Sequence, residues 1–307
     1  MKNYLILICF IMTATGQISA QVKSDSLAHT LLWKISGNGL KEPSYLYGTM
    51  HTGDDRVFRL QDSAMIDFDK VSVFAMEINM DSVDNMSMAN DMKLPEDQNL
   101  KDLLGEADYK LAGKYTMKQA GIPIFLLATV KPIYVWLLIL QGKQSKKEDV
   151  LDVFYFKLAK KENKRIIGLE KAEDQMKLLT NVPVDKQVAL LKEGIHNFKE
   201  LTASMNETTL DYTDADLNKL LAETETDTSM GNNFMEDFII KRNRVMTNGI
   251  ENVIRTNASL FTAVGAAHLP GKKGVINLLK EDGYTVSPVL SKNFLKAKDV
   301  KKRVKGK

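Results

Sequence analysis

The sequence predicts an α/β fold of the mixed α+β kind, in which many helices flank a central mixed sheet. Three observations predict it. Short β-rich segments occur near both ends of the chain, helical patterns fill the middle, and two of the segments run into the same Gly-x-x-His sequence. This order favours one sheet closed by strands from both chain ends.

Six segments are predicted as strands. The first two, 31–36 and 44–48, are joined by Gly37-Asn38-Gly39, which is typical of a turn between strands. Segment 71–78 is β-branched and aromatic, as buried strands are. The remaining strands are predicted at 165–169, 259–264 and 284–290.

Helical periodicity fills most of the rest of the chain, whereas 79–95 is polar and predicted as a loop, and 206–233 is acidic and irregular. The apolar stretch Ile122–Leu140 is interrupted by Lys131 and Pro132, so a buried core helix is favoured over a membrane span. Helices are predicted at 61–70, 106–119, 132–140, 148–162, 171–179, 185–202, 214–223, 234–256 and 272–282.

The composition is that of a globular protein: 307 residues, 44% hydrophobic and 26% charged. This excludes a disordered chain or a fibre. The net charge of +3 is unevenly spread, because residues 291–307 hold seven Lys and one Arg against one Asp. The mildly acidic remainder argues against nucleic-acid binding. We interpret 291–307 as a solvated basic C-terminal tail, with an anchor to an anionic surface as the alternative.

Residues 1–20 resemble a signal peptide. Lys2 precedes a short apolar run, Tyr4–Met12, and Ala20 provides a small residue for cleavage. The mature protein is then exported to the periplasm, the surface or the medium, and residues 21–290 form one domain without a linker-like boundary. The single cysteine, Cys9, lies inside the signal, so no disulfide is expected.

Two strands end in Gly-x-x-His, at Gly48 to His51 and at Gly265 to His268. Glycine permits a sharp structural turn or a close approach to a ligand. Each histidine then lies just past the carboxyl end of a strand, where α/β sheets hold their sites.

Two further strands end in an acid, Glu77 and Glu170. A buried carboxylate is costly unless it is paired or binds a cation. The order His, Glu, Glu, His suits a pseudo-two-fold arrangement in which the four groups converge. Imidazole and carboxylate together are ligands for a divalent metal such as Mn, Co, Zn or Fe, with one Glu left as general base. The alternative is that both histidines are hydrogen-bonded core residues.

An ordered set of motifs resembles the TraB/GumN family, which includes the TIKI-type metalloproteases. The resemblance covers about residues 30–290. Its motifs are Leu32-Trp33-Lys34-Ile35, Tyr47-Gly48-Thr49-Met50-His51, Glu77, Lys131-Pro132, Gly168-Leu169-Glu170 with Glu173 and Gln175, Arg242-Asn243-Arg244, and Gly265-Ala266-Ala267-His268-Leu269-Pro270-Gly271.

The resemblance implies an erythromycin-esterase/ChaN-like fold. For the TIKI branch it implies Mn- or Co-dependent peptide hydrolysis, and for the TraB branch it implies sequestration or degradation of a peptide pheromone. The implied site residues are His51, Glu77, Glu170, Arg242, Asn243 and His268. Arg242 would orient a carboxylate or stabilise an oxyanion, and Asn243 would hydrogen-bond a ligand group.

We therefore expect an exported, metal-dependent hydrolase of peptides. The alternative is a protein that sequesters a peptide or small ligand without catalysis, and a haem protein using Tyr45 or Tyr47 ranks third. The sequence has no Gly-x-Ser-x-Gly, no His-Glu-x-x-His and no Gly-rich phosphate loop. A methionine cluster around Glu77 is a candidate wall for a peptide cleft: Met76, Met80, Met86, Met88 and Met92.

Overall fold

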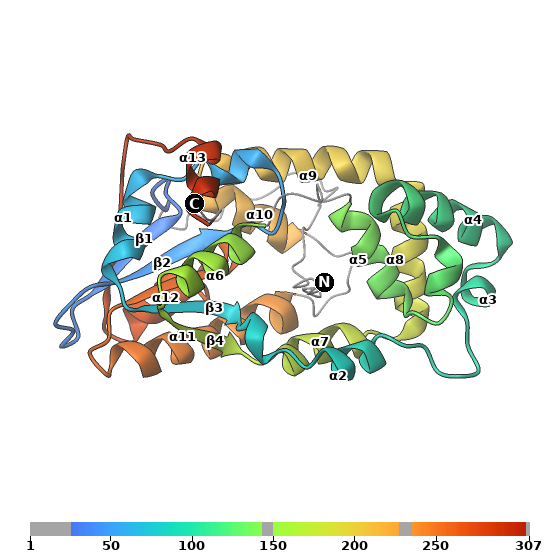
Figure 1. Ribbon diagram of the computed structural model, residues 1–307, viewed down its shortest axis with the longest axis horizontal. Coiled ribbons are helices and arrows are strands. Elements are labelled where there is room, and N and C mark those ends of the chain that lie inside the picture. Colours follow the sequence, from blue (N-terminus) through green and yellow to red (C-terminus); the bar gives the residue numbers. More distant parts are fainter. Residues whose placement is uncertain (1–25, 143–149, 227–234, 305–307) are drawn as a thin grey trace.

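The computed structural model describes residues 26–142, 150–226 and 235–304. At its centre is a six-stranded mixed sheet in the order β4-β3-β5-β2-β1-β6, so strands from both ends of the chain are neighbours (Figure 1). The predicted α/β fold with a central mixed sheet is confirmed. The strands are β1 Leu32–Ser36, β2 Ser44–Thr49, β3 Val73–Ile78, β4 Arg165–Glu170, β5 Leu260–Gly265 and β6 Thr285–Pro288.

Four neighbouring strands, β4, β3, β5 and β2, run parallel, whereas β1 pairs with β2 and β6 in antiparallel fashion. The turn after β1 contains Gly37, Asn38 and Gly39, with φ values of 77°, 48° and 80°. Glycine and asparagine adopt such left-handed values at low cost. Because parallel neighbours end at the same edge of a sheet, the residues that follow β4, β3, β5 and β2 are brought together there.

Helices cover both faces of the sheet. On one face, the rings of Phe68 and Tyr155 pack within 6.2 Å of both Phe74 and Phe261. Leu169 points to the opposite face and meets Gly249 there. Each aromatic pair adds roughly 0.5–1.5 kcal/mol beyond its buried area. The first face is covered by α1 (Asp62–Lys70) and α6 (Leu151–Lys161), and the second by α11 (Lys241–Ile254) with α12 (Val275–Glu281) packed beside it.

A helical lobe lies on the side toward which the parallel strands point (Figure 1). Its own buried cluster includes Val135, Trp136, Leu191 and Ile195. The predicted core helix is confirmed, because this segment is buried and has Pro132 in its first turn. No helix in the described ranges is long and apolar enough to span a membrane. The lobe contains α3 (Leu100–Leu104), α4 (Glu106–Tyr115), α5 (Pro132–Gln141) and α8 (Val184–His196).

Two sets of helices connect the sheet to this lobe. One is α9 (Phe198–Thr213) and the other is the pair α2 (Asn85–Asp91) and α7 (Ala172–Thr180) (Figure 1). The prediction of a loop over 79–95 is wrong where α2 forms. The side chain of Asp84 caps this helix by accepting from the N–H groups of Met86 and Ser87, and Met88 packs against Met176. A helix of two turns has too few apolar positions to show a period.

The predicted helix over 185–202 is also wrong, because the chain breaks at Asn197 into α8 and α9. The segment predicted as irregular contains the end of α9, which was not predicted, and α10 (Leu217–Thr226), which overlaps the short helix predicted at 214–223. In α9 the hydroxyls of Thr208 and Thr209 bond back to carbonyls of their own helix, at Ser204 and Met205. Because these hydroxyls find hydrogen-bond partners within the helix, polar residues are tolerated there, and the sequence shows no apolar periodicity by which the helix could be predicted.

The basic tail is not simply solvated. Residues 297–302 form α13, and the side chain of Val300 is in the main core with 1% exposed. Lys301 binds Asp55 and lies 4.3 Å from the centre of the Phe58 ring. The interpretation of 291–307 as a mobile solvated end is therefore corrected for this helix.

We predict that Val300→Ala lowers the free energy of unfolding by about 1–3 kcal/mol, as the loss of methyl groups from a core does. Urea unfolding of the full chain measures this. Lys298→Ala, an exposed change in the same helix, should stay within about 0.5 kcal/mol. Equal, small effects of the two changes would mean that α13 does not pack as described.

Candidate functional site

The four predicted strand-end residues meet at one edge of the sheet. His51 follows β2, His268 ends a 3₁₀ turn after β5, and the two acids lie at the ends of β3 and β4. Across the sheet the order is Glu170, Glu77, His268, His51. Four parallel neighbours are sufficient for this convergence, which needs no two-fold axis. All four side chains are buried, with 6%, 1%, 5% and 8% exposed in that order.

Arg242 joins the two carboxylates. Its Nη2 donates to Glu77 Oε2 at 2.6 Å and to Glu170 Oε2 at 2.8 Å, and its Nε donates to both Glu170 oxygens at 3.1 Å. Its Nη1 donates to the carbonyl of Phe238 at 3.1 Å. Phe238 lies in a π-helical turn, Met235–Ile240, where a continuous α-helix over 234–256 was predicted. The rigid guanidinium fork thus orients two carboxylates. Orientation of a carboxylate was one of the two roles predicted for Arg242; the other was stabilisation of an oxyanion.

The pKa values of the two acids move in opposite directions. Burial alone would raise both. For Glu77, burial is the largest single influence and acts to raise the pKa. Arg242, the two histidines and the Gly265 N–H, which donates to Oε1 at 2.7 Å, together outweigh it and hold the pKa below its usual range. For Glu170, burial dominates over Arg242 and the pKa is raised. Paired acids with pKa values pushed apart are suited to different roles, and Glu170 is the better proton acceptor.

Asn243 determines which nitrogen of His268 carries the proton. The amide Nδ2 of Asn243 donates to the carbonyl of Lys273 at 2.8 Å, so its Oδ1 accepts from His268 Nδ1 at 2.7 Å. His268 Nε2 is then left with a lone pair. Burial, with Arg242 nearby, lowers the pKa of His268 to about 3, so the ring is neutral at pH 7.

His51 has a matching partner that sequence reasoning missed. Its Nδ1 lies 3.0 Å from Oδ2 of Asp152, whose other oxygen accepts from Thr49 Oγ1 at 2.7 Å. Asp152 is only 1% exposed. It lies in the first turn of α6, among apolar residues of that helix. An acid in such surroundings is the sequence signal that could have identified it.

The two glycines serve close packing rather than a sharp turn, since neither has a positive φ. A Cβ on Gly48 would lie 3.1 Å from the Cβ of Ala266. A Cβ on Gly265 would lie 3.3 Å from Glu77 Oε1, 3.4 Å from His268 Cδ2 and 3.9 Å from His51 Nε2. Gly265 therefore leaves the small space that these three side chains share.

The donor atoms around this space suit a divalent cation. His268 Nε2 faces Glu77 Oε1 across 4.0 Å, and both atoms present electron pairs to the gap. Bonds from zinc to nitrogen or oxygen are about 2.0–2.2 Å, so two ligands of one tetrahedral ion lie about 3.4 Å apart, and this pair would have to close slightly around an ion. In the parts of the chain that the structure describes, no group of three or more His, Cys, Asp or Glu side chains is arranged to hold a metal ion. The fit rests on the His268–Glu77 pair, with His51 beside it.

The net charge of the buried cluster also favours a bound cation. Glu77, Glu170 and Asp152 are buried carboxylates, and one guanidinium, that of Arg242, is buried with them. Excess buried negative charge is costly unless a cation balances it. A divalent ion at the histidines would supply that balance.

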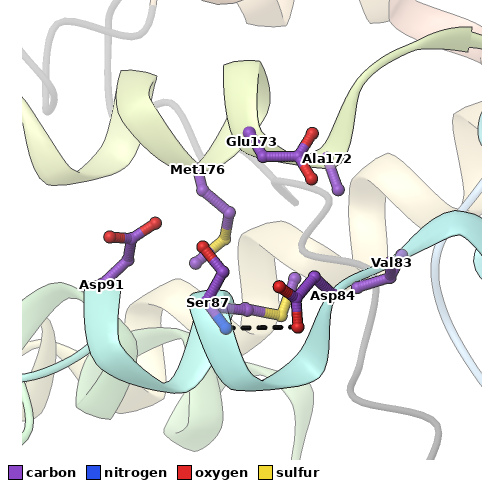
Figure 2. A pocket seen from close by; sticks show the side chains of 8 residues that line it. Val83, Asp84, Ser87, Asp91, Ala172, Glu173 and Met176 are labelled. Atoms are coloured by element: carbon purple, nitrogen blue, oxygen red, sulfur yellow. Dashed lines mark hydrogen bonds between the residues drawn. The ribbon is translucent and has the colours of Figure 1, made fainter.

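The other predicted features lie apart from this cluster. Met88 is buried between α2 and α7, whereas Met86 is 77% exposed. Figure 2 shows the pocket between these helices, lined by Asp84, Asp91, Glu173 and Met176 among others. Arg244, which follows Asn243 in its motif, pairs with Asp282 at the surface. The other two histidines of the chain, His29 and His196, lie outside the site.

A family model described as the TraB/PrgY/gumN family matches residues 31–288. The chain belongs to this family. Curated proteins also match. "Metalloprotease TIKI2" of Xenopus tropicalis is 24% identical over 89% of this chain and 62% of its own length. "Metalloprotease TIKI1" of Xenopus tropicalis is 22% identical over 86% of this chain and 62% of its own length. "Metalloprotease TIKI1" of Homo sapiens is 22% identical over 89% of this chain and 65% of its own length.

The chain spans about three-fifths of the length of the first of these relatives. No solved structure matches significantly. These relatives carry a metalloprotease name.

We predict that His268 makes stability depend on pH. In the unfolded chain a histidine binds a proton near pH 6.5, whereas folded His268 does so only near pH 3. As pH falls through this window the unfolded state gains a proton that the folded state does not. The free energy of unfolding should therefore fall by up to about 1.4 kcal/mol per pH unit.

Urea unfolding between pH 7 and pH 4, in chelator, tests this with wild type and His268→Gln. The difference between the two proteins should shrink or reverse as the pH falls. Two curves that stay parallel would show that His268 is not held neutral.

Proposed function

We propose that the protein is an exported, metal-dependent hydrolase of peptides. The observation that carries this proposal is the gap between His268 Nε2 and Glu77 Oε1, where two electron-pair donors 4.0 Å apart face each other. Membership of a family whose relatives include proteins named metalloproteases supports it. In this proposal His51, His268 and Glu77 hold the cation.

Manganese or cobalt is favoured and zinc or iron would also suit, because nitrogen and oxygen ligands of this kind bind all four. When bound, the ion would polarise the scissile carbonyl and make a water molecule more acidic. The protein's own groups must then accept a proton and hold the ligands in place.

Glu170 is assigned as the proton acceptor. It lies next to Glu77 across the sheet, and its pKa is raised by burial, which brings a carboxylate closer to the range of an effective base. Gln175 Nε2 donates to Glu170 Oε2 at 3.0 Å and lies 3.3 Å from Glu77 Oε2, so it helps to orient both carboxylates. Arg242 donates to both carboxylates, which offsets the repulsion between their charges and fixes their orientation.

Asn243 and the two glycines support this arrangement without contacting the peptide. Asn243 directs the lone pair of His268 into the shared space, and Gly265 leaves that space open. Gly48 lets the turn after β5 pack against β2. The hydroxyl of Tyr212 donates a hydrogen bond to the Gly48 carbonyl at 2.9 Å. We assign these residues to positioning.

The haem alternative finds no support in the described residues. Tyr45 and Tyr47 are 6% and 2% exposed, and the ring of Tyr47 packs against Tyr155 and Phe261. Neither phenol lies open to an axial position on a haem. Sequestration of a peptide without catalysis remains the competing function, and the experiment below separates the two.

Export is part of the proposal and rests on the sequence of residues 1–20, which lie outside the described residues. N-terminal sequencing of the protein from its native host would show a start at Gln21. A start at Met1 would contradict export by a cleaved signal.

We predict that Glu170→Gln lowers the turnover number for peptide cleavage by about 10²- to 10⁴-fold, as the loss of a general base does. Its affinity for cobalt or manganese should change far less, because Glu170 is not assigned as a ligand. Cleavage of a fluorogenic peptide library by the full chain loaded with each metal measures turnover, and calorimetry measures metal affinity.

Glu251→Gln is the matched control, since Glu251 is also a buried acid, in helix α11 against the sheet, and pairs with an arginine, Arg255, at 2.7 Å. It should keep wild-type turnover. Full turnover in Glu170→Gln would refute its role as base. No cleavage by wild type with any metal, together with peptide binding that survives chelation, would establish the sequestering function instead.

A further inference from the structure

We infer that Asp152 is a positioning residue that selects the metal-binding tautomer of His51. The inference rests on the proposed function in one respect, which is that His51 binds a cation. A buried aspartate carboxylate lies 3.0 Å from Nδ1 of this histidine. The contact is close without being aligned as a hydrogen bond. Two lone pairs at that distance would repel each other, which favours the tautomer with the proton on Nδ1 and leaves Nε2 to bind the ion.

Thr49 makes this selection directional. Its hydroxyl donates to Oδ1 of Asp152 at 2.7 Å, and both residues are 1% exposed. The carboxylate is therefore fixed through Oδ1, and its other oxygen, Oδ2, lies beside His51. Thr49 is the last residue of β2 and Asp152 lies in the first turn of α6, so the sheet and the covering helix together orient the ring.

The two histidines are thus supported in the same way by different chemistry. His268 is held by the neutral amide of Asn243, which is itself fixed by the carbonyl of Lys273. His51 is held by an anion. A carboxylate partner raises the electron-donating power of a histidine ligand more than an amide does, so His51 is the stronger of the two ligands.

The change Asp152→Asn tests this because it keeps the shape and reverses the polarity. With Thr49 donating to Oδ1, the new amide presents Nδ2 to His51. The ring must then accept at Nδ1 and carry its proton on Nε2, which leaves Nε2 without a lone pair for the metal until the tautomer changes. Affinity for cobalt should fall by about 10- to 100-fold, the usual cost of losing such a partner.

The direct readout is the tautomer of His51 in the metal-free full chain, from nitrogen-15 NMR, with His51→Ala to assign the signals. Wild type should carry the proton on Nδ1, and Asp152→Asn should move it to Nε2. The same variants are titrated with cobalt by calorimetry. Asp67→Asn is the matched control, because Asp67 is another buried aspartate, in helix α1 against the sheet and paired with Lys70, and should keep wild-type affinity.

Thr49→Val provides a second variant if Asp152→Asn does not fold. It removes only the hydroxyl that aims Asp152 and should weaken cobalt binding several-fold. A wild-type His51 protonated on Nε2, or unchanged cobalt affinity in the Asp152 and Thr49 variants, would overturn the inference. If wild type binds no metal, the proposed function fails, while the tautomer of His51 still decides the role of Asp152.

Discussion

The site depends on one constraint, which is that Glu77 and Glu170 are buried side by side and must share one guanidinium. Two carboxylates on adjacent strands would repel each other if Arg242 were absent. Arg242 lies within 2.6 to 3.1 Å of both acids and is itself held by the carbonyl of Phe238 in a π turn. Removing one partner from such a buried group typically costs about 3–5 kcal/mol, because the remaining charge is uncompensated.

The arrangement of strands makes the cluster possible. Because β4, β3, β5 and β2 are parallel and adjacent, residues far apart in sequence leave the sheet at one edge. Glycine at the ends of two strands lets side chains approach more closely than any other residue would allow, as the short distances around Gly265 show. Each histidine is then turned by a partner at Nδ1, so that Nε2 faces inward.

Much of the sheet and of the site could be predicted from the sequence, because both depend on local signals. Apolar β-branched segments mark the strands, and a polar residue at or just past the end of such a segment marks the edge, as for Glu77 and His51. Family resemblance identified Arg242 and Asn243. The sequence could not reveal the partners that only packing brings together, and Asp152, 101 positions after His51, is the clearest case.

Helices stabilised by packing rather than by an apolar stripe were missed for a related physical reason. The polar helix α9 satisfies its threonine hydroxyls internally, and α2 depends on Asp84 and on contact with α7. The docking of Val300 shows the same limit, since a basic composition does not reveal a single buried valine.

The most direct test of the account is whether the two histidines bind a divalent ion. The full chain is stripped with chelator, and its thermal unfolding is followed with manganese, cobalt, zinc or iron(II), with the His51→Ala/His268→Ala double variant alongside. At about 100 times the dissociation constant a metal should stabilise wild type by about 2.7 kcal/mol, and the double variant should show no shift. Equal stabilisation of both proteins, or none in a folded wild type, would contradict the metal site.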